Sequence, residues 1–544
     1  MKSNPNVLRS FLVFTLLFLP TILFTPWWTT DSFNIPKLLV ISCIGFALFI
    51  GILPGIRGHI TRIQLAAISL FTFAVVLSWA YGSHSILDQW FGDYGRSTGV
   101  QFYLTLIAII TSFIVIAEKA VGETVLWSLV ASWLVNVGYG LLQLFGSDPI
   151  KWENAYSPVF GTFGNPDFYS AFLGMGLVAS SALLLKPRRK WYLVITILVS
   201  SAASLLLIYK TSSVQGFLVI GIGGIVVIYL RFFRSGKSGL RLTFFSAIAI
   251  TGMLGILGIL DKGPLGHYLH ESSVSSRGDY WRAGLRMFFQ HPLTGVGLDS
   301  YGDWYRASRD LEAAQRFSAG VVTNAAHNVF IDIAASGGAL LLVGYLMIIA
   351  MIILSSLRLT RKEMHFDHVH AALIAVFFGY LAQSAVSINQ VALGLWGWAL
   401  GGVIVGLENR QSRADTEHTS SHSSGFAIRA ALGSLIGFIL IAPIFIKDAK
   451  YLEALKAGDA IKIERVARSW PQTSYYLQFS SGIFADNKLY SPALSLAQAA
   501  TKLNGRDYEA WDLIFQNKSS SQSQKSEALR HMRDLDPYNM EIRK

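Results

Sequence analysis

The first candidate for chemistry is a polar segment that leads directly into a long apolar run, Asn324-Ala-Ala-His327-Asn328-Val-Phe-Ile-Asp332. The apolar run ends near Leu357, so it is long enough for a membrane helix with His327 at its water-facing end. The start of a helix favours anions such as phosphate, and an imidazole titrates close to neutral pH. His327 is therefore a candidate base beside a phosphorylated substrate, and an interfacial histidine without a chemical role is the simpler alternative.

Arginines in the preceding segment supply a second candidate. Arg277, Trp281 and Leu285 fall at i, i+4 and i+8, so in a helix they share one face, and Arg282 and Arg286 lie on the neighbouring face. Guanidinium groups are permanently charged and planar and donate two parallel hydrogen bonds, which suits a diphosphate. A surface helix resting on anionic lipid headgroups would show the same spacing, so the pattern alone leaves both interpretations open.

Two further features of this segment lead to structural predictions. Pro292, Gly295 and Gly297 are expected to end the helix and to allow a tight return towards the membrane. Asp279 and Asp299 could orient a substrate hydroxyl, but single carboxylates in a loop more often pair with local arginines, and we expect that role.

The composition is that of a membrane protein. Of the 544 residues, 52% are hydrophobic and only 14% are charged, which is too apolar for a soluble chain of this length. The net charge of +12 is scattered in short clusters between apolar runs, so we expect no nucleic acid partner. Cys43 is the single cysteine, and no Cys/His cluster has the spacing of a zinc site, so neither a metal nor a cofactor is predicted.

The apolar runs define an all-α polytopic fold of about thirteen transmembrane helices, because a bilayer core needs about 20 apolar residues per helix and leaves the backbone no other hydrogen-bond partners. We place the spans at 8–28, 37–54, 63–81, 100–117, 122–145, 167–185, 191–209, 213–230, 243–260, 328–357, 370–388, 391–407 and 425–446. The first run follows Lys2 and Arg9 and is interpreted as a span, since no small-residue cleavage site follows it.

Lys and Arg are concentrated in alternate short loops, which predicts a cytoplasmic N-terminus. The long loop 261–326 then lies outside the cytoplasm together with loops 82–99 and 146–166. We therefore divide the chain into a membrane domain, 1–445, which includes this loop as the catalytic loop, and an extracytoplasmic helical domain, 446–544.

The C-terminal part has a weak internal repeat. Arg468-Ser-Trp470-Pro471, Lys502-Leu-Asn504-Gly505 and Asp534-Leu-Asp536-Pro537 recur about every 32 to 34 residues. This period is similar to that of tetratricopeptide helical hairpins, which usually bind a protein or peptide partner, and a plain helical cap on the membrane domain is the alternative.

Several of these stretches together resemble the O-antigen ligase and O-antigen polymerase (Wzy-type) superfamily over roughly residues 60–407. The matching pieces are Arg277 with Trp281, Pro292-Leu-Thr-Gly295-Val-Gly297, Ala326-His327-Asn328 with Gly337, Gly161-Thr-Phe-Gly-Asn165-Pro166 and Phe91-Gly-Asp-Tyr-Gly-Arg96. The resemblance implies a GT-C-like membrane glycosyltransferase in the cytoplasmic membrane of a bacterium. Such an enzyme takes a glycan from an undecaprenyl diphosphate carrier on the outer face and joins it to an acceptor hydroxyl.

Carried over to this chain, the family's essential histidine is His327 and its loop arginine is Arg277. The sequence departs from the family at Gln215, which stands where members often carry an arginine, so Lys210 or Arg96 would have to supply that charge. Arg282, Trp281, Asn165, Asn328 and Gln215 complete the predicted set of diphosphate- and glycan-binding residues.

These residue types suit a single inverting displacement. Arginines would stabilise the leaving diphosphate, and His327, with an ordinary pKa of about 6.5, would take the acceptor proton. The outer loops hold no Asp-x-Asp pair, which argues for a metal-independent transferase. Three acceptors fit: an envelope lipid (ligase, our first choice), a second glycan (polymerase) or a protein hydroxyl. A lipid or polysaccharide transporter is the alternative from another class, although charges near the bilayer midplane, which transporters use, are hard to find here.

Overall fold

The structure is a computed structural model of the chain. It describes residues 5–82, 85–152, 157–185, 190–233, 272–316, 318–362, 366–413 and 425–542, and the positions 239, 241–244, 246 and 253. Within these residues it contains helices, turns and loops and no β-strand.

The membrane part is a bundle of long apolar helices. Among the described residues nine helices are long and apolar enough to cross a membrane, and three shorter apolar helices lie with them. The bundle consists of α1 (Pro5–Ile22), α2 (Ile35–Ile52), α4 (Arg62–Tyr81), α6 (Val100–Ile116), α7 (Lys119–Leu144), α8 (Pro166–Leu184), α9 (Trp191–Lys210), α10 (Gln215–Ile228), α16 (Val329–Lys362), α17 (His368–Ser384), α18 (Val391–Arg413) and α19 (Phe426–Ala457). The predicted all-α polytopic fold is confirmed, and every predicted span except one meets a helix.

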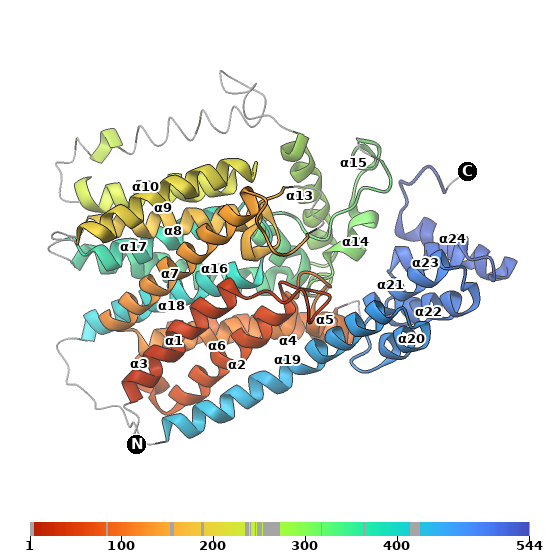
Figure 1. The fold of residues 1–544 in the computed structure, drawn as a ribbon, viewed down its shortest axis with the longest axis horizontal. Coiled ribbons are helices and arrows are strands. Elements are labelled where there is room, and N and C mark those ends of the chain that lie inside the picture. The colour runs from red at the N-terminus through yellow and green to blue at the C-terminus, as the bar shows by residue number, and fades with distance from the viewer. Residues whose placement is uncertain are drawn as a thin grey trace.

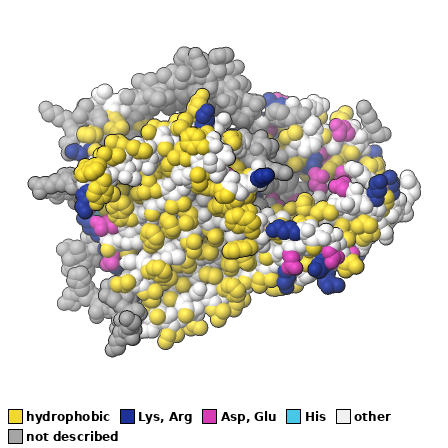
Figure 2. Space-filling view, viewed as in Figure 1, with side chains coloured by type: hydrophobic (Ala, Val, Ile, Leu, Met, Phe, Trp, Pro, Cys, Tyr) yellow, Lys and Arg dark blue, Asp and Glu magenta, His cyan; other side chains and the backbone are white. Residues whose placement is uncertain are grey.

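The remaining predicted span, 243–260, lies almost wholly outside the described residues. Figure 1 shows the helices running side by side, with α5 (Ile86–Phe91), α13 (Ser272–Gln290), α14 (Tyr301–Ser308) and α15 (Leu311–Arg316) gathered at the end opposite the N-terminus. Hydrophobic side chains cover the face seen in Figure 2, and most of its charged side chains lie towards the two ends. This distribution fits a membrane protein whose helices are bounded by water on both sides.

The buried fraction of each helix indicates whether it lies at the centre or at the edge of the bundle. The apolar window of α18 is entirely buried, whereas only 22% of the window of α9 is buried. α18 packs on α6, α16 and α17. α18 is thus the central helix and α9 a peripheral one facing lipid.

Helix α16 is kinked at Gly338, and the predicted turn after α13, residues 292–297, binds to the backbone of α16 at this kink. Gly338 has a positive φ of 65°, so the helical hydrogen-bond ladder is interrupted there. Val296 N–H donates to Ala335 O at 2.9 Å and Gly297 N–H donates to Ser336 O at 3.0 Å, which pairs the carbonyls that the kink leaves open. The prediction that the proline-glycine segment returns the chain to the membrane is confirmed.

The C-terminal helices form antiparallel pairs. They are α20 (Ala460–Arg468), α21 (Ser474–Asp486), α22 (Tyr490–Leu503), α23 (Tyr508–Gln516) and α24 (Gln522–Leu535). The three repeat markers lie at equivalent places, because α20, α22 and α24 end at them. This agrees with helical hairpins, and the tetratricopeptide assignment stays a prediction. The predicted domain boundary at 445/446 falls inside α19, so the last membrane helix continues directly into the C-terminal helices.

Ion pairs fasten the C-terminal helices to the segment after α13. The carboxylate of Asp536 is fully buried and accepts from Arg309 at 2.7 Å and from Arg306 at 3.3 Å. Arg306 also binds Glu509 at 2.7 Å. Since removal of one partner would leave a buried charge unpaired, this contact fixes the position of the C-terminal helices on the outer loops.

Gly338→Ala is expected to lower the free energy of unfolding by about 2–4 kcal/mol, through the cost of a positive φ and of a clash. A Cβ on Gly338 would lie 2.4 Å from the carbonyl carbon of Leu293. Gly138 in α7 is the matched control, since a Cβ there meets nothing within 4 Å, and Gly138→Ala is expected to be neutral or slightly stabilising. The check is thermal unfolding of both variants in detergent, and equal midpoints would contradict the role given to the kink.

Candidate active site

His327 is presented by a tight turn just before α16. Its φ is +51°, in the left-handed region that residues other than glycine seldom adopt. The turn is held from within the helix, because Asp332 Oδ1 accepts from Ala326 N–H at 2.8 Å. Such backbone strain costs about 1–3 kcal/mol and is common at functional sites.

Asn328 begins helix α16 and ties it to the neighbouring connection. Its side-chain oxygen accepts from Phe330 N–H at 3.0 Å and from Ile331 N–H at 3.2 Å, so it caps two backbone donors at the helix start. Its amide nitrogen donates to Ala385 O, between α17 and α18, at 2.8 Å. These contacts explain why an asparagine directly follows the histidine. They also fix the position of the His327 turn relative to α16, α17 and α18.

Arg277 and Tyr280, both on α13, lie around the His327 ring. The Tyr280 ring centre is 5.5 Å from that of His327. Burial, together with the nearby charges of Arg277 and Arg96, lowers the His327 pKa to about 4, and Asp167 opposes this effect. The structure therefore brings the two predicted catalytic residues together, and His327 is neutral at physiological pH.

The arginines of α13 differ in what they bind. Arg282 contacts Asp279 and, through Nε, lies 3.0 Å from Asp310 Oδ2. Arg286 lies 3.2 Å from the same Asp310 oxygen. Arg277, half-buried, makes no ion pair with any carboxylate in the described part of the chain. Arg277 is thus the α13 arginine whose charge is available to an anion beside His327.

Arg96 is the centre of a buried ion-pair network. It is only 8% exposed, and its Nη2 lies 3.4 Å from Asp332 Oδ2. Its Nε lies 3.2 Å from Asp299 Oδ1, close enough for an ion pair although it is not aligned as a hydrogen bond. Its Nη1 donates to Asn324 O. With two carboxylates beside it, Arg96 is placed to position the His327 turn, and its predicted contact with the diphosphate stays a prediction.

The predicted roles of the two loop carboxylates can now be compared with their partners. Asp279 binds Arg282 and also Arg316, at 3.1 Å, so the prediction of local arginine partners is confirmed. Asp299 also binds an arginine, but that arginine is Arg96, from a distant part of the sequence.

The other predicted binding residues are less directly connected to His327. Asn165 caps α8, accepting from Asp167 N–H at 2.8 Å. Gln215 is fully buried and accepts from Gln383 Nε2 at 3.1 Å. Lys210 is exposed at the end of α9, and Trp281 is half-buried with an indole N–H that has no partner among the described residues. The structure gives Asn165 and Gln215 roles in helix packing, and their substrate contacts stay predictions.

Sequence reasoning missed Tyr280, Asp167 and Asp332. Asp332 carried a detectable signal, because a carboxylate in the first turn of a helix suits the positive helix end. Tyr280 and Asp167 carried none, since their place near His327 follows from tertiary packing and not from the local sequence.

Comparison with known proteins agrees with this geometry. A family model described as O-antigen ligase matches residues 169–346, a segment that begins in α8, includes Arg277 and His327, and ends in α16 beyond the kink. No curated protein matches the chain. Residues 169–346 therefore match an O-antigen ligase domain, which supports a place in the O-antigen ligase superfamily for this polytopic membrane protein.

Proposed function

We propose that the protein transfers a glycan from an undecaprenyl diphosphate-linked donor to an acceptor hydroxyl on the outer face of a bacterial cytoplasmic membrane, in the manner of an O-antigen ligase. The observation that supports this most is the pairing of Arg277 and a neutral His327 within the matched O-antigen ligase domain. The family match also supports glycan transfer over the transporter alternative.

The reaction is a single displacement at the anomeric carbon. The acceptor oxygen forms a bond to C1 of the donor sugar while the bond from C1 to the diphosphate oxygen breaks. The electron pair leaves with the undecaprenyl diphosphate, whose developing charge Arg277 stabilises, and the acceptor proton passes to an imidazole nitrogen of His327. Attack opposite the leaving group inverts the configuration at C1. We expect no metal requirement.

A glycan acceptor (polymerase) or a protein hydroxyl (O-oligosaccharyltransferase) are the other subclasses that this mechanism serves. The C-terminal helices, clamped to the outer loops through Asp536, favour an acceptor that is recognised outside the membrane. We keep ligase-type transfer as the first choice, with a possible protein partner on the C-terminal hairpins.

His327→Ala and Arg277→Ala are each expected to lower transfer by about 10²- to 10³-fold, the range for loss of a general base or of a group stabilising developing charge. The assay uses purified protein in liposomes with a diphosphate-linked oligosaccharide and lipid, glycan or peptide acceptors, and the labelled acceptor identifies the subclass.

Arg286→Ala and His291→Ala are the matched controls for these variants. Both residues lie at the end of the same helix, Arg286 already pairs with Asp310, and His291 packs its ring against Trp304. Both controls should retain transfer. Normal activity in His327→Ala or Arg277→Ala would refute the mechanism, and inhibition by a chelating agent would refute metal independence.

The pH dependence gives a separate test of the base. Because the His327 pKa is lowered to about 4, His327 stays neutral and able to accept a proton from pH 7 down to about pH 5, and the rate should fall only below that. Removing the Arg277 charge removes one cause of the lowered pKa, so the residual activity of Arg277→Gln should decline at a higher pH. A wild-type midpoint near 6.5 would contradict the lowered pKa of His327.

A further inference from the structure

A cavity separate from the His327 cluster lies between the outer loops and the C-terminal helices. Its volume is about 180 Å³, smaller than the roughly 300–1,000 Å³ of pockets for drug-sized ligands, so it suits a single small ring. Residues from four regions line it: the start of α2, the stretch from α5 to the start of α6, the segment from Leu298 into α14, and the chain from α19 to α23. Its lining carboxylates are Asp88, Asp93, Asp299, Asp303, Asp507 and Glu509, and no lysine, arginine or histidine of the described part of the chain lines it.

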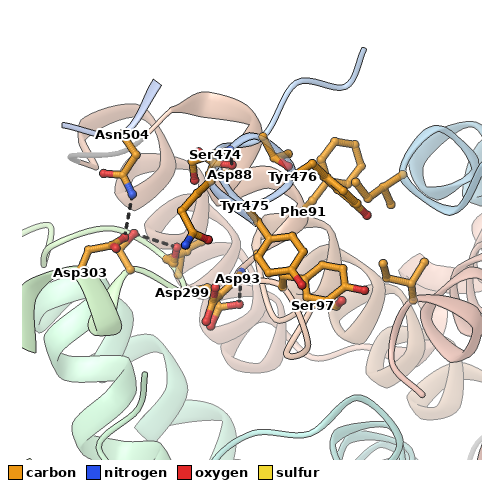
Figure 3. Close-up of a pocket in the computed structure, with 18 of the residues that line it drawn as sticks. Asp88, Phe91, Asp93, Ser97, Asp299, Asp303, Ser474, Tyr475, Tyr476 and Asn504 are labelled. Atoms are coloured by element: carbon orange, nitrogen blue, oxygen red, sulfur yellow. Dashed lines mark hydrogen bonds between the residues drawn. The ribbon is translucent and has the colours of Figure 1, made fainter. Parts of the chain in front are cut away.

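Contacts across the cavity hold its walls in place. Asp88 accepts from Ser474 N–H at 3.0 Å, and Asp303 accepts from Asn504 Nδ2 at 3.1 Å, so each bond joins an outer loop to the C-terminal helices. The Tyr475 ring stacks on that of Tyr94 at 3.7 Å between centres. Figure 3 shows Asp88 and Asp93 next to Tyr475, with Asp299 and Asp303 further along the lining towards Asn504. Neither part of the chain encloses this cavity alone.

Two buried side chains on the lining keep unpaired polar atoms. Gln101 is 2% exposed and Thr473 is 5% exposed, and both line the cavity. The Gln101 side-chain oxygen and the Thr473 hydroxyl have no hydrogen-bond partner among the described residues. Buried polar groups are nearly always paired, so these two atoms indicate a ligand that offers hydrogen bonds at this place.

The charge of the lining restricts the ligand class. A phosphate or a carboxylate would be repelled, so the donor's diphosphate does not belong here. Burial, together with Asp299 and Asp303, raises the pKa of Asp93 to about 7, and burial with Asp303 raises the pKa of Asp507 to about 8. Near neutral pH these carboxyls can both donate and accept hydrogen bonds, which matches the hydroxyls of an uncharged sugar.

A chain of contacts links the cavity to the His327 turn. Asp299 lines the cavity and also contacts Arg96, which binds Asp332, the residue that holds the backbone before His327. We infer that the cavity binds an uncharged sugar unit of the acceptor and so places the acceptor hydroxyl at His327. The assignment of this sugar unit to the acceptor rests on the proposed function. With the sugar bound in the cavity, the C-terminal helices form part of the substrate site.

Direct binding tests the inference without the donor. The full-length protein is titrated with the methyl glycosides of glucose, galactose, mannose and N-acetylglucosamine, with glucuronate as the anionic probe and ethanolamine as the cationic probe, and binding is followed by saturation-transfer NMR. We expect at least one neutral glycoside to bind and glucuronate to bind much more weakly.

Substitutions in the cavity should weaken this binding without unfolding the protein. Thr473→Val keeps the shape of the side chain and removes one neutral hydrogen bond, so affinity should fall roughly 3- to 10-fold, whereas Asp303→Asn removes a charged acceptor and should cost roughly 10- to 100-fold. Asp486→Asn is the control, since Asp486 is an exposed carboxylate at the end of α21 outside the cavity lining.

The transfer assay separates this inference from the proposed function. Thr473→Val should raise KM for the acceptor and leave kcat and KM for the donor unchanged. Sugar binding that the variants weaken, in a protein that transfers nothing, would support a sugar site and refute the transferase. Binding of ethanolamine alone, unchanged binding in both variants, or a raised KM for the donor instead would overturn the acceptor subsite.

Discussion

The buried guanidinium of Arg96 is the interaction on which the outer part of the protein depends. It joins three segments that are distant in sequence: its own loop, the segment before α14 through Asp299, and the start of α16 through Asp332. A charge at this depth is tolerated only with partners that compensate for the loss of water. The same pairs that keep Arg96 stable therefore set the distance between the loops, and they fix the turn that carries His327.

The kink in α16 also helps to position the residues around His327. A straight helix would offer no backbone acceptors at Ala335 and Ser336, and the turn after α13 would have nothing to bind. Gly295 and Gly338 allow the two backbones to approach, since a Cβ on Gly295 would lie 2.3 Å from the Ser336 carbonyl carbon. The turn anchors the end of α13, so the kink indirectly positions Arg277 beside His327. The segment from Pro292 to Gly297 thus acts largely through its backbone, which pairs with that of α16.

Hydropathy predicted the helices well because lipid imposes a length and an internally bonded backbone on every span. The structure brings Arg277 and His327 close together as the sequence suggested, and their catalytic roles stay predictions. The partners of Arg96 were out of reach, because Asp332 lies 236 residues further along the chain and no local signal links them. Gln215 was placed among the substrate ligands by its position in a motif, whereas the structure buries it against Gln383. Local patterns thus selected the candidate residues, and tertiary packing determined which charges are available.

The continuity of α19 has a mechanical consequence. α19 is one helix from Phe426 to Ala457 with Pro443 inside it, and two of its residues, Ile441 and Ile444, line the cavity beneath the C-terminal helices. A transmembrane helix adjusts its tilt to the thickness of the surrounding bilayer. Because α20 follows closely after Gly458, a change in the tilt of α19 would also move the C-terminal hairpins. The position of the C-terminal hairpins is thus coupled to that of a membrane helix.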